Sequence, residues 1–163
     1  MPRTSGVLHV HSCPSAVVPH VEWTVAAELG VRVSLPWTAQ PADPAMLRTE
    51  LSWRGDCGTA GRLAAALRGW SVLRFEVTEQ ASPGADGERW SVTPSLGVFR
   101  CATSVNGDLL VSEDRLRSLL ATRTGPQLPL GLDQLLGGAW DDELEPYRRG
   151  ADGAAATWLH QVV

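Results

Sequence analysis

The stretch GVLHVHSCPSAVVPHVEW, residues 6–23, decides the start of the fold because its hydrophobic period changes in the middle. Apolar residues alternate through GVLHVH, residues 6–11, which is the two-residue period of a strand. SCPS then interrupts the alternation, and Pro19 suits the first turn of a helix, where a missing N–H costs nothing. Gly30 is a natural left-handed end for this helix. The sequence therefore opens with a strand followed directly by a helix.

The same strand-and-helix alternation returns further along the chain. The pattern predicts a strand at 31–37, a loop at 38–46, a strand at 47–54, a helix at 59–68 closed by Gly69, and a strand at 71–79. The order strand, helix, strand, strand, helix, strand is that of the ferredoxin-like, or split βαβ, fold. Right-handed crossovers would place its first and last strands side by side at the centre of an antiparallel sheet, with both helices on one face.

The second half of the chain carries weaker signals. Residues 90–105 read as extended with an interruption near Pro94 and Gly97, and Asn106-Gly107 is a strong signal for a two-residue hairpin. Ser112 can cap a helix, a shorter helix is expected around residues 132–136, and TWLHQVV, residues 157–163, is expected to cover a sheet edge as a strand. We therefore expect one α+β domain, 1–163, in which residues 1–80 form the ferredoxin-like core and residues 81–163 add a hairpin and a helical extension.

Composition and charge exclude several classes of function. The formal net charge of −4 repels polyanions and argues against nonspecific nucleic-acid binding. No apolar run approaches the twenty residues that a membrane helix needs, and MPRTSG lacks the apolar core of a signal peptide, so we expect a cytoplasmic protein without a membrane partner. The three cysteines, Cys13, Cys57 and Cys101, form no CxxC pair, and we expect reduced thiols and no metal or cofactor.

Five segments resemble an uncharacterised actinobacterial family, the domain of unknown function 3145 (DUF3145). They are VLHVHSCPSAVVPHVEW, GVRVSLPWTAQPA, ELSWRGDCGTAGRLAAALRGW, LRFEVTE and TPSLG. The resemblance extends over nearly the whole chain, and it implies a small bacterial cytoplasmic protein. It implies no activity and no functional residues.

The opening histidines allow three interpretations. His9 and His11 project from the same face of a strand, close enough to share a metal with Cys13, His20 or Glu22, but no second ligand pair follows downstream. Cys13 precedes a helix N-terminus near His11 and could be a nucleophile, although no third group is available to orient the pair. The third interpretation, which we favour, is that these residues are the ordinary side chains of a strand and a helix start.

The segment GDCGTAGR, residues 55–62, joins a predicted strand to a predicted helix through three glycines. Backbone N–H groups at such a helix start can hold a phosphate. The phosphate-binding loop of nucleotide hydrolases needs a lysine, however, and the chain contains none. Glycines for a turn and for close packing are the favoured interpretation.

The four predicted strands would separate apolar and polar side chains onto opposite faces of the sheet. The polar face would collect His9, His11, Arg32, Arg48, Glu50, Arg54, Arg74 and Glu76. Arginines on such a face can bind carboxylate or phosphate groups, whereas charged cross-strand pairs on a solvated face simply stabilise the sheet. The face lacks the stacking aromatic residues that RNA-recognition sheets use. The candidate ligand-binding residues are His9, His11, Arg48, Glu50, Arg74 and Glu76.

These patterns favour a non-catalytic binding or regulatory module for an anionic small molecule or for an acidic segment of a partner protein. One alternative is a small enzyme with His9 or His11 as acid or base, with or without Cys13. Another is an interaction subunit that buries some of its seven tryptophans against a partner protein. Trp140, beside the acidic DDELE, is the candidate partner-binding residue.

Overall fold

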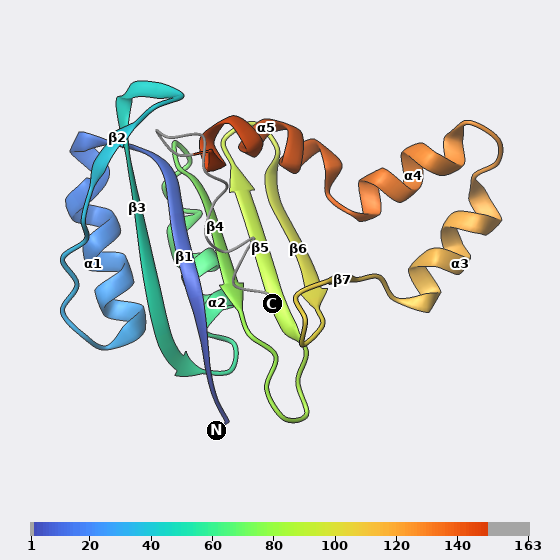
Figure 1. Ribbon diagram of the computed structural model, residues 1–163, viewed down its shortest axis with the longest axis horizontal. Helices are drawn as coiled ribbons and strands as arrows, with labels where there is room; N and C mark the ends of the chain where they lie inside the picture. The colour runs from blue at the N-terminus through green and yellow to red at the C-terminus, as the bar shows by residue number, and fades with distance from the viewer. Residues whose placement is uncertain (1, 150–163) are drawn as a thin grey trace.

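The computed structural model describes residues 2–149, in which seven strands form one antiparallel sheet flanked by helices (Figure 1). The strands are β1 (Arg3–Pro14), β2 (Thr38–Gln40), β3 (Asp43–Asp56), β4 (Arg74–Glu79), β5 (Gly87–Thr93), β6 (Gly97–Thr103) and β7 (Leu109–Leu110). A 3-10 turn, η1 (Ser15–Val17), precedes the helices α1 (Val18–Leu29), α2 (Thr59–Leu67), α3 (Glu113–Thr122), α4 (Gln127–Leu135) and α5 (Gly138–Arg148). None of these helices is long and apolar enough to cross a membrane.

The strand order is β2-β3-β1-β4-β5-β6-β7, and each neighbouring pair is antiparallel. The first strand therefore lies between β3 and β4, and its position beside the fourth strand is the one expected from the sequence. His9 pairs with Glu50 on β3 and with Glu76 on β4, so one row of residues crosses the centre of the sheet. A register shift after Val10 bends the upper end of β1.

The predicted strand at 31–37 and the predicted loop at 38–46 are both wrong. Residues 32–37 pair with no neighbouring strand. Pro36 has no N–H to donate to a strand, and the Leu35 amide donates instead to the Glu22 carboxylate of α1 (2.9 Å). The Trp37 indole donates to the same carboxylate at 3.0 Å. Pairing begins only at β2, within the expected loop, and a tight turn at 41–42 leads into β3. Val33, Leu35 and Trp37 of this segment are buried or half-buried without strand pairing, and Val33 and Trp37 pack against the hydrophobic core.

Helices α1 and α2 cover one face of the sheet (Figure 1), and the hydrophobic core lies beneath them. The apolar face expected from the sequence is confirmed. Its strand residues in the core are Leu8, Val10, Trp53, Phe75 and Val77, with Leu51 and Val33 packed at the margin. Each helix contributes its own apolar stripe, such as Val21 and Val25 on α1. Gly30, at a φ of 67°, ends α1 as expected.

The second half of the chain extends the sheet and then leaves it. The hairpin β5–β6 agrees with the expectation. A hairpin also forms at Asn106-Gly107, but residues 104–108 separate β6 from β7 in place of the two-residue loop expected, and the Gly107 amide donates to the Ser104 carbonyl at 2.9 Å. The Ser112 hydroxyl accepts the Arg115 amide at the start of α3. The helix expected around residues 132–136 is the longer α4, and α5 follows where no helix was expected. The expected final strand at 157–163 lies outside the described residues.

The close packing of Gly6, where β1 pairs with β4, gives a test of the fold. A Cβ atom at Gly6 would overlap the Thr78 carbonyl oxygen and the Trp53 ring, both of which are fixed in the sheet. We expect Gly6→Ala to lower the free energy of unfolding by about 3 kcal/mol, as overpacking against backbone does. Gly69→Ala is the matched control, since its Cβ would meet only the Ala66 carbonyl, at an ordinary 3.4 Å. Equal urea midpoints for the two variants would contradict this packing.

Candidate functional site

The polar face of the sheet contains the predicted site residues, but its upper half is not solvated. His9, His11 and Glu76 are 2%, 1% and 0% exposed, so the expectation of an open surface is wrong at these positions. Helix α5 lies across the upper ends of the strands, on the side opposite α1 and α2, and contacts β1 and β5 (Figure 1). No helix was predicted at residues 138–148, so the polar face was expected to be open to solvent.

The Glu76 carboxylate is the centre of a buried hydrogen-bond network. Arg148 of α5 reaches it with two parallel bonds, from Nε to Oε2 (2.9 Å) and from Nη2 to Oε1 (2.6 Å). His11 Nε2 donates to Oε2 at 2.9 Å, and the Ser91 hydroxyl donates to Oε1 at 2.7 Å. Three elements, β1, β5 and α5, therefore converge on one side chain of β4. Such a two-point guanidinium–carboxylate contact fixes orientation as well as adding energy.

The network determines the charge of each member. Burial by itself would raise the pKa of Glu76, but the hydrogen bonds from His11 and Arg148 outweigh it and hold the pKa far below its usual value. Burial opposes the charge of Arg148 as well, yet the hydrogen bond to Glu76 raises its pKa above the usual value. Both side chains are therefore ionised throughout the physiological range, and each compensates the other's loss of water.

His9 lies beside this pair and stays neutral. Its ring stacks on His11, with centroids 5.8 Å apart and an interplanar angle of 5°. Burial lowers the pKa of His9 to about 3, and the electrostatic interactions with His11, Arg48 and Arg148 act in the same direction, while Glu76 opposes them. Its Nδ1 lies 3.6 Å from the Glu50 carboxylate. A ring that is neutral and 2% exposed does not meet an external substrate as acid or base.

The remaining candidates lie at the margin of the buried network. Arg74 is half-buried, pairs with Glu143 of α5 at 3.3 Å and lies over the Tyr147 ring, 4.6 Å from its centroid. Glu50 and Arg48 are half-buried on β3. The structure thus brings His9, His11 and Glu76 into direct contact, with Glu50 against His9, and places Arg74 against α5.

Trp140 helps to attach α5 to the sheet. Its indole Nε1 donates to the Gly97 carbonyl at 3.0 Å, and its ring packs on Phe99 with centroids 5.4 Å apart. The side chain is half-buried by these contacts. Its expected role in binding a partner protein stays a prediction, and its observed contacts are within the chain.

The other two candidate sites considered from the sequence, Cys13 and the glycine-rich segment 55–62, have structural roles. Cys13 lies in the hydrophobic core, where burial raises the pKa of its thiol to about 11, the opposite of what a nucleophile needs. At the start of α2, the Glu79 carboxylate accepts the Gly58 and Ala60 amides at 2.8 and 2.9 Å, so the expected anion position holds a side chain of β4. Within residues 2–149, no three His, Cys, Asp or Glu side chains are grouped as metal ligands.

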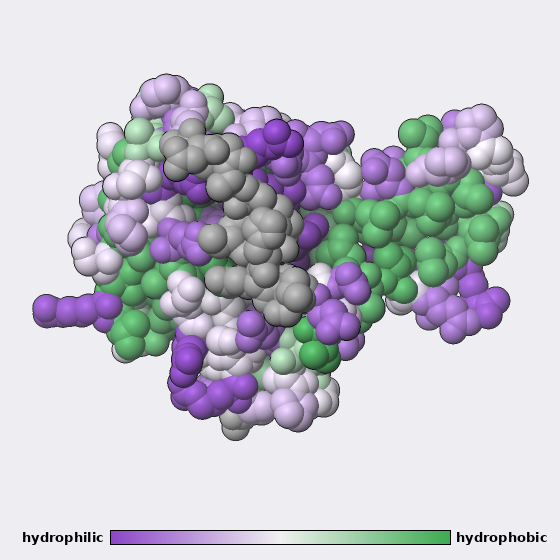
Figure 2. Space-filling model, in the orientation of Figure 1, coloured by the Kyte–Doolittle hydropathy of each residue, from purple (hydrophilic) through white to green (hydrophobic). Residues whose placement is uncertain are grey.

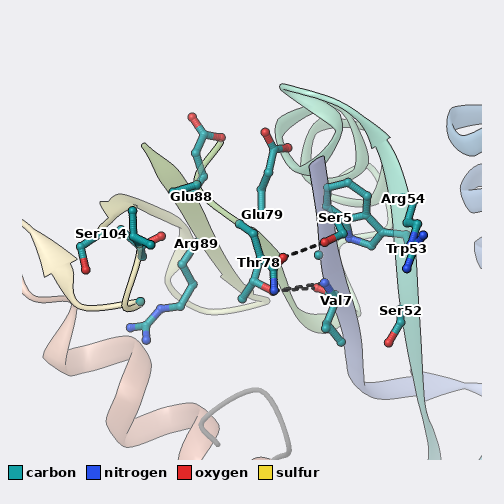
Figure 3. Close-up of a pocket in the computed structure, with 16 residues that line it drawn as sticks. Ser5, Val7, Ser52, Trp53, Arg54, Thr78, Glu79, Glu88, Arg89 and Ser104 are labelled. Atoms are coloured by element: carbon teal, nitrogen blue, oxygen red, sulfur yellow. Dashed lines mark hydrogen bonds between the residues drawn. The ribbon is translucent and has the colours of Figure 1, made fainter. Parts of the chain in front are cut away.

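The lower half of the sheet, away from α5, contains a groove of about 610 Å³ (Figure 3), which we call the open groove. Its polar lining comes from the strands β3, β1, β4 and β5 and from the turn before β7. Its polar lining residues include Ser5, Ser52, Arg54, Thr78, Arg89 and Ser104. Arg89 lies 3.7 Å from Asp141 of α5, while Arg54 is exposed on β3. Figure 3 shows Arg89 and Ser52 on the opposite side of the sheet from the Glu79 and Glu88 carboxylates.

Sequence reasoning missed Arg148, Ser91 and the helix that carries Arg148. Segment 138–148 has an acidic residue in its first turn and an arginine in its last, which is the charge order that a helix favours. Pro146 within the segment weakened that signal. The turn residues QASPGADGER, 80–89, are typical of a hairpin that would pair β5 with β4, but nothing in the sequence singled out Ser91, which lies opposite Glu76 in that pair.

Removing one partner of the central pair tests its energetic weight. Glu76→Gln removes the buried carboxylate and leaves Arg148 only the partly exposed Asp141 and Glu145, so we expect the free energy of unfolding to fall by about 3 kcal/mol. Glu113→Gln is the control, because it changes the same group in an exposed pair with Arg117 and should cost about 0.5 kcal/mol or less. Replacing both Glu76 and Arg148 with Met should recover part of the loss in urea unfolding. Similar losses for Glu76→Gln and Glu113→Gln would show that the buried pair contributes no more than a surface pair.

The lowered pKa of His9 predicts a pH dependence of stability. Because the unfolded chain takes up this proton near pH 6.5 and the folded chain only near pH 3, the His9 contribution is complete above pH 6.5 and decreases as the pH falls towards 3. At pH 5.5 the loss from His9 should be about 1.4 kcal/mol. His9→Gln should lose this part of the slope between pH 8 and 5.5, whereas His20→Gln, on α1, should keep it. An unchanged slope in His9→Gln would contradict the burial of a neutral ring.

Comparison with known proteins gives a single finding. Residues 7–161 match the model of the family described as "Protein of unknown function (DUF3145)", which confirms the resemblance noted in the sequence. The search of curated proteins finds no match, and neither does the search of solved structures. Since the family model extends over nearly the whole chain, this protein belongs to the DUF3145 family.

Proposed function

We propose that this protein is a non-catalytic binding module whose ligand is a small anionic molecule held in the open groove. The proposal moves the predicted ligand site along the polar face, from the half covered by α5 to the half that α5 leaves open. The buried arginine already has carboxylate partners, since Arg148 contacts Glu76 and Asp141. Carboxylates of the chain itself therefore occupy the anion-binding positions of Arg148 in the upper half of the polar face.

The observation that carries the proposal is the state of Arg54. Its guanidinium is exposed at the groove and, among residues 2–149, makes no hydrogen bond or ion pair. Ser52, two residues earlier on the same strand face, adds an exposed hydroxyl. Arg89 lines the groove from β5 and adds positive charge there. A guanidinium that can form two parallel bonds is suited to carboxylate and phosphate groups.

The size and chemistry of the groove support a ligand rather than a reaction. Its volume of about 610 Å³ is within the usual range for small-molecule sites. The Thr78 hydroxyl accepts a hydrogen bond from the Val7 amide, and the Ser5 hydroxyl donates to the Gln80 side chain. These two hydroxyls therefore already have hydrogen-bond partners within the chain. The two histidines that could act as acid or base are sealed beneath α5. These features favour binding over catalysis.

We also propose that residues 3–79 form a ferredoxin-like unit and that the protein acts in the cytoplasm. Support for the first comes from the position of β1 between β3 and β4, the antiparallel pairing on both sides, and the two helices on one face. β2 is only three residues long, much shorter than the second strand of that fold usually is. Cys13, Cys57 and Cys101 form no disulfide with one another, which supports the second.

Ligand-induced stabilisation tests the proposed site. We expect one of three probes, inorganic phosphate, citrate or AMP, to raise the thermal midpoint by about 5 °C or more at a hundredfold excess over its Kd. Arg54→Gln should abolish this shift, because it removes the guanidinium that has no partner within the described residues. Arg32→Gln is the matched control, since Arg32 is also exposed but lies between α1 and β2. No shift with any probe, or an equal shift in Arg54→Gln, would refute the proposal.

A further inference from the structure

Helices α3 and α4 form a two-helix arm that projects away from the sheet (Figure 1). The two helices touch each other closely at Gly131 of α4, where a Cβ atom would overlap the Leu119 side chain of α3. No residue of α3 is buried, and α4 buries only Gly131. The arm is therefore a helical hairpin that receives little cover from the rest of the described chain.

The arm exposes an apolar surface, to which five leucines between 37% and 63% exposed contribute: Leu116, Leu120, Leu130, Leu132 and Leu136. Leu116 and Leu120 are four residues apart and so lie on the same side of α3. Leu132 and Leu136 have the same spacing at the C-terminal end of α4. In Figure 2 the apolar surface of the arm forms one connected area with polar residues at its edges. Contiguous exposed apolar surface of this kind marks an interaction site.

The chemistry that fits this surface is present in the same chain, in the sequence AAATWLHQVV, residues 154–163. Its larger apolar residues and one alanine are spaced as the stripe of an amphipathic helix, at Ala155, Trp158, Leu159, Val162 and Val163. The adjacent pairs 158–159 and 162–163 do not alternate, so this spacing favours a helix over the strand expected at 157–163. A ten-residue helix is marginal in water by itself and needs an apolar surface to pack against.

The length of the intervening chain matches the distance to the arm. Helix α5 begins directly after α4 and has eleven residues, so it carries the chain about 16 Å away from the end of α4. The linker GADG, residues 150–153, contains two glycines, and the five steps from residue 149 to residue 154 span up to about 17 Å. A chain that turns back along α5 therefore brings residue 154 to the end of α4.

The dimensions and direction of the two surfaces also agree. A helix over residues 154–163 is about 15 Å long, and the nine-residue α4 is about 14 Å long. Figure 2 views the molecule from the side on which α5 crosses the sheet in Figure 1, and the apolar surface of the arm faces the same way. A helix that starts at the end of α4 can therefore run back along the whole apolar surface of the arm.

We propose that residues 154–163 form an amphipathic helix that packs on the apolar surface of the α3–α4 arm of the same chain. The stripe that contains Trp158 and Leu159 covers the exposed leucines, and the three helices make a small bundle beside the sheet. A short linker gives such a segment a local concentration in the millimolar range. The chain's own segment is therefore favoured over a second copy or a separate protein. This inference is independent of the open groove.

Hydrogen exchange of the full chain, followed by mass spectrometry, tests the contact from both sides. Amides of residues 157–163 should exchange at least about tenfold more slowly than those of an unstructured peptide. Both Trp158→Glu/Leu159→Glu and Leu132→Glu/Leu136→Glu should abolish this protection, because each places two charges in the apolar contact. His160→Glu/Gln161→Glu is the matched control, since it adds the same charges on the other side of the proposed helix and should keep the protection.

The exchange of β1 and β4 should be equal in all of these variants, which shows that the sheet stays folded. Unprotected amides at residues 157–163 in the wild type would overturn the proposal. Protection that survives Leu132→Glu/Leu136→Glu would also overturn it, because the segment would then pack elsewhere.

Disulfide trapping identifies which chain supplies the segment. Leu132→Cys/Leu159→Cys is made with Cys57→Ser, since Cys13 and Cys101 are buried and Cys57 is only half-buried. Oxidised glutathione should close a disulfide within one chain. Thr157→Cys in place of Leu159→Cys is the control, because Thr157 lies opposite the apolar stripe, and its disulfide should form about tenfold more slowly. Equal rates for the two cysteine pairs, or a disulfide-linked dimer as the main product, would refute packing within one chain.

Discussion

The bidentate contact between Arg148 and Glu76 is the interaction on which the arrangement of this protein depends. Glu76 is placed by β4 at the centre of the sheet, and Arg148 arrives from the last turn of α5, 72 residues later in the sequence. A buried carboxylate and a buried guanidinium are each costly alone, and only their contact makes either acceptable. The pair therefore specifies where α5 must lie, and the position of α5 decides which half of the polar face solvent can reach.

The position of α5 has two consequences for the rest of the molecule. On the sheet, it closes the upper half over the stacked histidines and leaves the open groove below, where Arg54 has no partner among the described residues. Beyond the sheet, α5 anchors the far end of the α3–α4 arm, whose other end follows β7. Trp140 strengthens the same attachment through its bond to the Gly97 carbonyl. The position of α5 therefore determines which residues are buried in the network, where the groove stays open and where the α3–α4 arm ends.

Much of the sheet could be predicted from sequence because its signals are local. The alternation in β1 and β4, the glycine after α1 and the Asn106-Gly107 turn each depend on a few neighbouring residues, and the two faces of the central strands follow from them. The strand predicted at residues 31–37 does not form, because Pro36 and the hydrogen bond from the Leu35 amide to Glu22 prevent strand pairing in spite of the alternating pattern. The burial of His9 and His11 could not be predicted, since it depends on a distant helix with an internal proline. The polar residues were correctly placed on one face, but alternation specifies the face and not what covers it.

A titration of the His9 ring by nuclear magnetic resonance tests the sealed network most directly. The ring signals of His9 should stay nearly constant from pH 8 to pH 4, because the pKa of His9 in the folded protein is about 3. In Arg148→Met, where α5 loses its central contact, the same ring should become accessible and titrate near the ordinary value of 6.5. A wild-type His9 that titrates near 6.5 would show that α5 does not close this face of the sheet.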